Sequence, residues 1–187
     1  CELARDILGE GAKIGLITWS FEYWFTNYHD SVIRDKIGTE YGLDVIEEQG
    51  FVSNEDAYNV ANSMLLKYPD IEGFYISYMT PAMDVVAACE DAQRSDIKII
   101  TGAYDVPTLL NMANGGNIAG FSTDTTYLVG VNSVLVAAYG LLGKEGPEYA
   151  VCPSIPLTLE NIREVWDIGM KIPLPEDVDT ALTAAGY

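Results

Sequence analysis

Apolar residues are distributed along this chain in two alternating patterns. Short continuous runs predict buried β-strands, and longer stretches in which apolar residues recur every three or four positions predict helices with one buried face. The runs predict five strands, at residues 13–18, 43–47, 73–77, 97–101 and 118–122. Helical spacing follows most of them, at residues 31–37, 57–68 and 82–92, and a shorter helix is expected before the turn at 114–117.

Local signals support these assignments. Ser53, followed by Asp56, predicts a helix N-cap, and Thr80 with Pro81 predicts the start of the next helix. Residues 19–28 are rich in aromatic side chains and are expected to form a loop after the first strand. Strands that alternate with helices at this spacing predict an α/β fold, in which one parallel sheet is covered by helices on both faces. The predicted lobe comprises residues 1–124.

The regular alternation ends at Asp124. Residues 125–143 carry no charged side chain and include a helix at 127–142, but this segment is at the short limit for a membrane span, so we expect a buried helix. Because its apolar side chains are too many for a solvated helix, it is expected to pack against a second copy of the chain or to fold back on its own lobe. Residues 144–187 form a return segment and a tail.

Composition narrows the classes of function. The formal net charge is −18, so the surface repels nucleic acids and anionic lipids. Three cysteines without a closely spaced pair, together with one histidine, give little support to a metal site. No phosphate loop, dinucleotide fingerprint or catalytic elbow motif is present, and we expect no cofactor. Cys89 lies on the buried stripe of its helix and is expected to be a core residue.

Candidate binding residues gather after the predicted strands. Ligands of parallel α/β sheets bind beyond the carboxyl ends of the strands, where connecting loops meet. Aromatic faces stack on rings or polyols, and carboxylates accept hydrogen bonds from hydroxyl groups, so the set indicates a ring-shaped or polyhydroxylated small molecule. The side chains at these positions are Trp19, Phe21, Tyr23, Trp24, Phe25, His29, Phe51, Tyr78, Tyr104, Asp105 and Asp124.

The order of the segments resembles the second half of a type 1 periplasmic solute-binding protein of the ribose-binding kind, which serves an ABC importer. The resemblance covers roughly residues 10–145 and rests on whole segments, chiefly 67–76, 97–105 and 117–124. Such proteins have two α/β lobes that close on a ligand, and the chain crosses between the lobes three times. The resemblance implies that 1–124 is the carboxyl-terminal lobe, that 125–143 is a crossover helix of the other lobe, and that this other lobe lies outside the sequence.

The resemblance also assigns ligand contacts by position. His29 stands where the family usually has an arginine, although Val32 and Ile33 replace the Gly-Phe pair that normally follows it. The family's aromatic residue falls at Phe51 or Val52, and its polar residue after the third strand falls at Ser77 or Tyr78. Its remaining polar contacts fall at Asp105 and Asp124. The ligand-binding residues that we predict are Trp19, Trp24, His29, Phe51, Tyr78, Asp105 and Asp124.

Structural roles compete with these assignments. His29 is equally compatible with a solvated position at the start of a helix. Trp19 and Trp24 could instead close the end of the hydrophobic core. Asp105 and Asp124 could each cap the helix that follows it.

The leading hypothesis is therefore the ligand-binding lobe of an extracytoplasmic receptor that binds a sugar or polyol without chemistry and delivers it to an ABC permease. Such a receptor is periplasmic, or extracellular and lipid-anchored, and Cys1 is a candidate for the lipidated residue. The alternatives are the effector domain of a lactose-repressor-type regulator and, third, a glycoside-modifying enzyme with Asp105 and Asp124 as its carboxylate pair. One lobe alone is expected to bind ligand weakly or not at all.

Overall fold

The computed structural model describes all residues from 1 to 187 and contains one six-stranded sheet with the order β2-β1-β3-β4-β5-β6. The first five strands are parallel, and β6 pairs antiparallel with β5. All five predicted strands are confirmed, whereas β6 was not predicted. The strands are β1 (Lys13–Trp19), β2 (Asp44–Phe51), β3 (Gly73–Ile76), β4 (Lys98–Gly102), β5 (Ile118–Asp124) and β6 (Ser154–Leu157).

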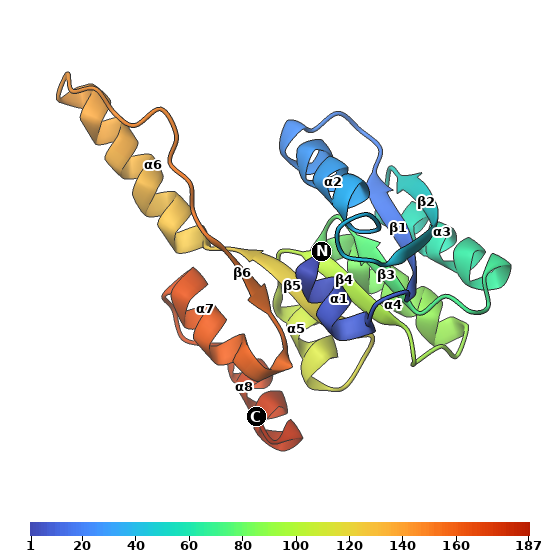
Figure 1. Cartoon of the computed structure of the whole chain (residues 1–187). Coiled ribbons are helices and arrows are strands. Elements are labelled where there is room, and N and C mark those ends of the chain that lie inside the picture. The colour runs from blue at the N-terminus through green and yellow to red at the C-terminus, as the bar shows by residue number, and fades with distance from the viewer.

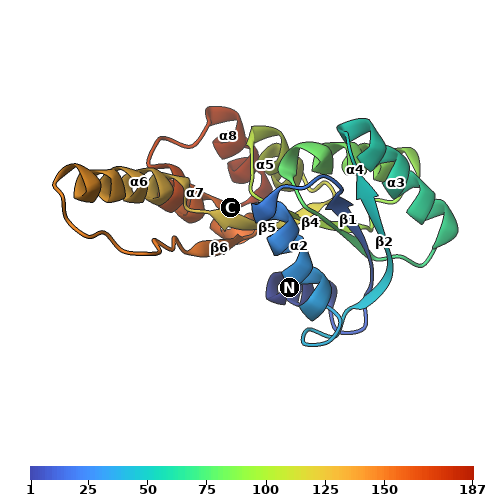
Figure 2. The ribbon, with the colours of Figure 1, turned by 90° about the horizontal axis from the view of Figure 1, so that it is seen from above.

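Helices cover both faces of the sheet, as predicted (Figure 2). On one face α1 and α2 enclose a smaller core that contains Ile14, Leu16 and Tyr75. On the other face α3, α4 and α5 enclose the larger core, to which α7 and α8 also contribute. The helices are α1 (Glu2–Leu8), α2 (Trp24–Lys36), α3 (Asn54–Lys67), α4 (Met79–Asp91), α5 (Val106–Ala113), α6 (Thr126–Leu141), α7 (Ile162–Met170) and α8 (Glu176–Ala185), with a short 3₁₀ turn at Leu159–Asn161.

Of the two helix starts predicted from capping residues, one is confirmed and the other lies earlier in the chain. Ser53 caps α3 by accepting a hydrogen bond from the backbone N–H of Asp56, as predicted. Helix α4 begins at Met79, one residue before the predicted cap Thr80, so Pro81 lies within its first turn. Proline fits there because the first N–H groups of a helix have no partner within it.

The aromatic segment after β1 is only partly a loop. Helix α2 begins at Trp24, seven residues before the predicted start at Ser31, and is therefore about two turns longer at its amino-terminal end than predicted. Periodicity did not reveal these turns because their side chains are mostly solvent-exposed aromatics rather than a buried stripe. The consequence is that Trp24 and Tyr28, four residues apart, share one face of a helix.

Helix α6 is not buried. Figure 1 shows that it projects away from the sheet, and none of its residues is buried. The predicted buried helix is therefore wrong for this chain, and the helix does not fold back on its own lobe. None of the helices combines the length and the apolar character that crossing a bilayer requires.

Candidate functional site

A cleft of about 820 Å³ lies between helix α2, the end of β5, helix α6 and the segment that returns from α6. The cleft lies beyond the carboxyl ends of the strands, where parallel α/β sheets bind their ligands. Most of its lining is apolar, and a few polar groups point into it, which is the usual composition of a small-molecule site. Its lining residues are Trp24, Phe25, Tyr28, Asp124, Val129, Asn132, Ser133, Val136, Pro147, Glu148, Ala150, Val151 and Cys152.

Two aromatic rings form the α2 wall of this cleft. The rings of Trp24 and Tyr28 are stacked with an interplanar angle of 6° and centroids 5.7 Å apart. Trp24 is 79% exposed and Tyr28 is 61% exposed, so neither ring helps to fill the core. Exposed, mutually supported rings offer a flat apolar surface on which a ligand can stack.

The crossing between the sheet and α6 forms the floor of the cleft and is held by side-chain hydrogen bonds. Thr123 Oγ1 donates to the carbonyl of Ile155 at 2.7 Å, and Thr125 Oγ1 donates to the carbonyl of Pro153 at 3.0 Å. Both threonines are buried, whereas Asp124 between them is exposed. The two buried threonines therefore hold the crossing segments together, and the exposed Asp124 carboxylate remains in the cleft.

Asp105 has a local partner instead. Its Oδ1 accepts hydrogen bonds from the backbone N–H of Thr108 at 3.0 Å and from Thr108 Oγ1 at 2.7 Å, which forms a capping box at the start of α5. Asp105 thus has the helix-capping role that competes with ligand contact as an explanation for this residue. For Asp124 it is not, because the N-cap of α6 is Thr125 and no side chain caps that helix.

A neighbouring hollow of about 580 Å³ contains three more of the predicted residues, Trp19, Phe51 and Tyr78. The Trp19 ring meets Phe51 edge-on at 5.2 Å and Tyr78 at 5.8 Å. Phe51 is only 1% exposed and belongs to the larger core, so its ring supports Trp19 from below. The Tyr78 hydroxyl is hydrogen-bonded to Thr26 of α2, and burial raises the pKa of this phenol.

His29 is half-buried on α2 and lines neither of these two hollows. Its Nδ1 lies 3.0 Å from the hydroxyl of Tyr75. Burial lowers the pKa of His29, whereas the Asp30 and Asp124 carboxylates raise it and the amino group of Cys1 lowers it further. His29 is therefore not the solvated helix-start residue that the alternative interpretation proposed.

A buried polar network beside His29 was missed by the sequence analysis. Asp30 is 2% exposed and accepts hydrogen bonds from Tyr75 and from Ser77, each at 2.7 Å. Ser77 in turn accepts from the backbone N–H of Trp19 at 3.1 Å. One signal was available in the sequence: Tyr75 and Ser77 stand two residues apart at the end of a strand, so their side chains point to the same face.

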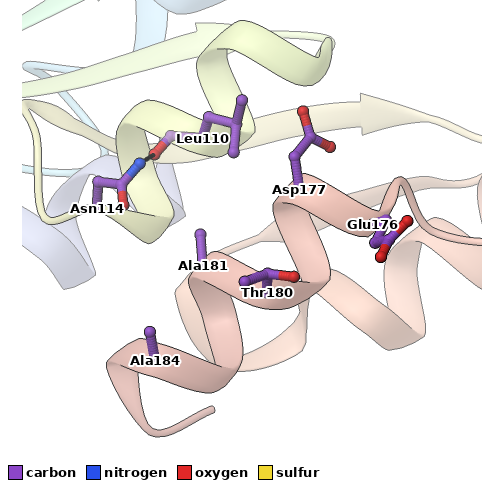
Figure 3. Close-up of a pocket in the computed structure, with 7 residues that line it drawn as sticks. All are labelled: Leu110, Asn114, Glu176, Asp177, Thr180, Ala181 and Ala184. Carbon is purple, nitrogen blue, oxygen red and sulfur yellow. Dashed lines mark hydrogen bonds between the residues drawn. The ribbon is translucent and has the colours of Figure 1, made fainter.

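A third hollow, the groove between α5 and α8, differs in chemistry (Figure 3). Its lining has no aromatic side chain, and its carboxylates, Glu176 and Asp177, stand in the first turn of α8, where they offset the helix dipole. The side-chain N–H of Asn114, the residue that ends α5, donates a hydrogen bond to the carbonyl of Leu110. Cys89 is fully buried, as predicted, and burial raises the pKa of its thiol to about 12.

Comparison with known proteins supports the fold. No family model matches the sequence, and no curated protein matches it. Solved structures do match: a glucose-galactose binding protein from Geobacillus stearothermophilus has 22% identity and a TM-score of 0.75, over 86% of this chain and 57% of its own. An ABC transporter solute-binding protein from Agrobacterium vitis, bound with α-D-tagatopyranose, has 16% identity and a TM-score of 0.77, over 86% of this chain and 54% of its own.

A carbohydrate transporter solute-binding protein from Agrobacterium radiobacter, in complex with D-arabinose, has 19% identity and a TM-score of 0.76, over 89% of this chain and 58% of its own. This chain thus spans somewhat more than half the length of the solved structures that it matches. The predicted resemblance is confirmed at the level of the fold: the chain has the architecture of one part of the sugar-type solute-binding proteins of ABC importers.

Proposed function

We propose that this chain, which has the fold of one part of a sugar-type solute receptor, is the ligand-binding lobe of an extracytoplasmic receptor for an ABC importer. Its ligand is a sugar or a sugar-like polyol, which it binds without changing it chemically. The observation that carries the proposal is the cleft at the carboxyl ends of the strands, where the stacked Trp24 and Tyr28 rings share a lining with the Asp124 carboxylate.

These groups suit the chemistry of a sugar. A pyranose or furanose ring has apolar C–H faces that stack on aromatic rings, and its hydroxyl groups donate hydrogen bonds to carboxylate oxygens. Trp24 and Asp124 are the two predicted residues that the structure brings together in this cleft. Trp19 and Tyr78 lie together beside it, and we propose that they complete the site together with His29 and Asp105 when a second lobe closes over the ligand. Phe51 was predicted as a ligand contact, but it is buried in the core and contributes through its support of Trp19.

The domain assignment forms part of the same proposal. Residues 1–124 grip the ligand, α6 belongs with the second lobe, and the polypeptide returns through residues 144–187. The exposed apolar side chains of α6, among them Val134 at 70% and Leu141 at 89% exposure, support this division because such a surface requires a protein partner. In the receptor the permease is the further partner, and Cys1 is a candidate lipid anchor.

A carboxylate-pair enzyme is less well supported. Asp105 is engaged by Thr108 at the start of α5, so Asp105 and Asp124 do not form two free carboxylates that face one cleft. A binding role requires no such pair. The strong negative charge disfavours a regulator that acts on nucleic acid, although it does not bear on an effector domain linked to a basic head.

A thermal-shift screen tests the proposal. The chain is heated with sugars, polyols and nucleosides at concentrations of tens of millimolar, because a ligand that binds only the folded state raises the midpoint by mass action. We expect the largest rise from a sugar or polyol, and we expect Trp24→Ala to reduce it. A larger rise with nucleosides, or a sugar response that Trp24→Ala leaves intact, would contradict the proposal.

A further inference from the structure

The buried carboxylate of Asp30 links α2 to the sheet through two hydroxyl groups. Tyr75 donates to Oδ1 and Ser77 donates to Oδ2, both at 2.7 Å, and neither donor is a cation. Hydrogen bonds to a carboxylate in a low-dielectric interior are short and strong, so the Tyr75 proton has a fixed direction. Burial and the Asp30 charge raise the pKa of Tyr75 well above its ordinary value, so the phenol keeps this proton.

The direction of that proton decides the state of His29. Tyr75 has one hydroxyl hydrogen, and it points at Asp30, so only oxygen lone pairs face His29 Nδ1 at 3.0 Å. Two acceptors at this distance would repel each other, and therefore Nδ1 carries a hydrogen and donates it to Tyr75. In the neutral ring only one nitrogen is protonated, which leaves Nε2 with a free lone pair.

We propose that Asp30 and Tyr75 are positioning residues that hold His29 as the Nδ1–H tautomer, so that Nε2 accepts a hydrogen bond from a hydroxyl group of the ligand. The ligand part of this inference rests on the proposed function, whereas the tautomer does not. At this position the site would therefore bind a ligand that presents a neutral hydroxyl group as the hydrogen-bond donor.

Nε2 is available for this role. It makes no hydrogen bond within the chain and is not among the buried atoms that lack a partner, so it reaches solvent. Asp124, which lines the cleft, is close enough to influence the ring electrostatically, together with Asp30 and the amino group of Cys1. Burial lowers the pKa of His29, and the ring is therefore neutral at pH 7.5.

The surroundings of Nε2 discriminate between ligands. A hydroxyl group can donate to Nε2, but a ligand carboxylate brings only acceptors and a negative charge beside Asp30 and Asp124. An anionic sugar acid would face repulsion from both the lone pair and the two carboxylates. The site should therefore prefer a neutral sugar to the acid of the same skeleton.

Nitrogen-15 NMR of the intact chain tests the tautomer directly, because His29 is the only histidine and gives one set of ring signals. At pH 7.5 we expect a protonated Nδ1 and an unprotonated Nε2, and we expect Tyr75→Phe to shift the ring toward the Nε2–H form that a solvated histidine side chain prefers. Tyr58→Phe is the matched control, since the Tyr58 hydroxyl also donates to an aspartate, Asp91, at 2.7 Å.

If Tyr75→Phe does not fold, Asp30→Leu gives a second test, because it removes the acceptor of the Tyr75 proton, which can then donate to Nδ1. An Nε2–H ring in the wild-type chain would overturn the inference. So would an unchanged ring in whichever of these variants folds. Neither result depends on a ligand.

The ligand part is tested by titrating the labelled chain with D-glucose and D-galactose and with their uronates. We expect a neutral sugar to shift the Nε2 resonance at a concentration at least severalfold lower than its uronate does. A uronate that acts at the lower concentration would overturn the ligand preference while leaving the proposed function intact. No shift with any of the four would count against both the ligand preference and the proposed function, and the tautomer result would still stand.

Discussion

Trp24 follows β1 and Phe51 is the last residue of β2, yet the environments of these two aromatic residues in the structure are opposite. Trp24 is 79% exposed and stacks on Tyr28 at the wall of the cleft, whereas Phe51 is 1% exposed and supports Trp19 from the core. Sequence identifies such residues as aromatic, but it does not show which of them face water, because burial is decided by the packing of distant elements. Substitution of Trp24 should therefore affect mainly ligand binding, and substitution of Phe51 should affect mainly stability.

Replacement of Trp24 by alanine should weaken sugar binding without harming the fold. Loss of the stacking surface lowers affinity roughly tenfold, whereas the free energy of unfolding changes by less than about 0.5 kcal/mol because the ring is solvent-exposed. Leu66→Ala is the matched control, since Leu66 is also 79% exposed but lies on α3, away from the cleft. Paired titration calorimetry and urea unfolding measure both quantities. Equal affinities in the two variants would contradict the role of Trp24.

The stability of the chain should depend on pH through His29. Burial lowers its pKa in the folded state below the ordinary value of 6.5, so between these two pKa values the unfolded state binds more protons than the folded state. Stability therefore rises with pH through this window and is lost as the pH falls through it. Urea unfolding between pH 5 and pH 7.5 should show this slope, and His29→Gln should flatten it. A slope that is the same in both proteins would exclude His29 as its source.

At the level of elements, the sequence predicted the strands and most of the helices that pack on them. The five parallel strands and the cap of α3 follow from apolar runs and from Ser53, both of which are local signals. The start of α2 and the strand β6 were not predicted. The first two turns of α2 lack a buried stripe, and β6 is four residues long and takes its place from backbone pairing with β5.

The candidate site was predictable to a similar degree. The rule that ligands bind at the carboxyl ends of strands located Trp24 and Asp124, which the structure brings into one cleft. It did not locate Asp30, because a buried carboxylate on a helix cannot be distinguished by spacing from a solvated one. Its role depends on Tyr75 and Ser77, which are more than 40 residues away in the sequence.

Asp105 provides a prediction at the scale of one helix. Asp105→Ala removes the cap of α5 and should lower the free energy of unfolding by about 1 kcal/mol, because the N–H of Thr108 loses its acceptor. Asp105→Asn is the control that retains an acceptor oxygen, and it should lose clearly less stability. Urea unfolding at pH 7.5 compares the two variants. Equal losses would show that charge rather than capping sets the contribution of Asp105.

At the scale of the whole molecule, helix α6 is the main unpartnered surface (Figure 1). Residues 125–143 carry no charge, so the net charge of −18 is located elsewhere and does not prevent two α6 helices from meeting. We expect the chain, when studied without a second lobe, to form a dimer through α6. Light scattering should show twice the monomer mass, and Leu135→Asp should give monomers.

Leu66→Asp is the control for this experiment, since it places the same charge on an exposed apolar position of α3. That variant should remain dimeric. A monomeric wild-type chain whose α6 is rapidly cleaved by protease would contradict the proposed dimer, and the exposed helix would then need another partner.

Sugar binding in the cleft beside α2 can be observed directly by NMR, through the three indole N–H signals of Trp19, Trp24 and Trp166 during a sugar titration. Trp24 lines the cleft, Trp19 lies beside it, and Trp166 is buried in α7 as an internal reference. We expect a saturable shift of the Trp24 signal, a smaller shift of the Trp19 signal and no shift of the Trp166 signal, with a Kd of about 1 mM or weaker because one lobe grips only one side of the ligand. Micromolar or tighter binding would contradict the need for a second lobe, and shifts confined to Trp166 would contradict the site.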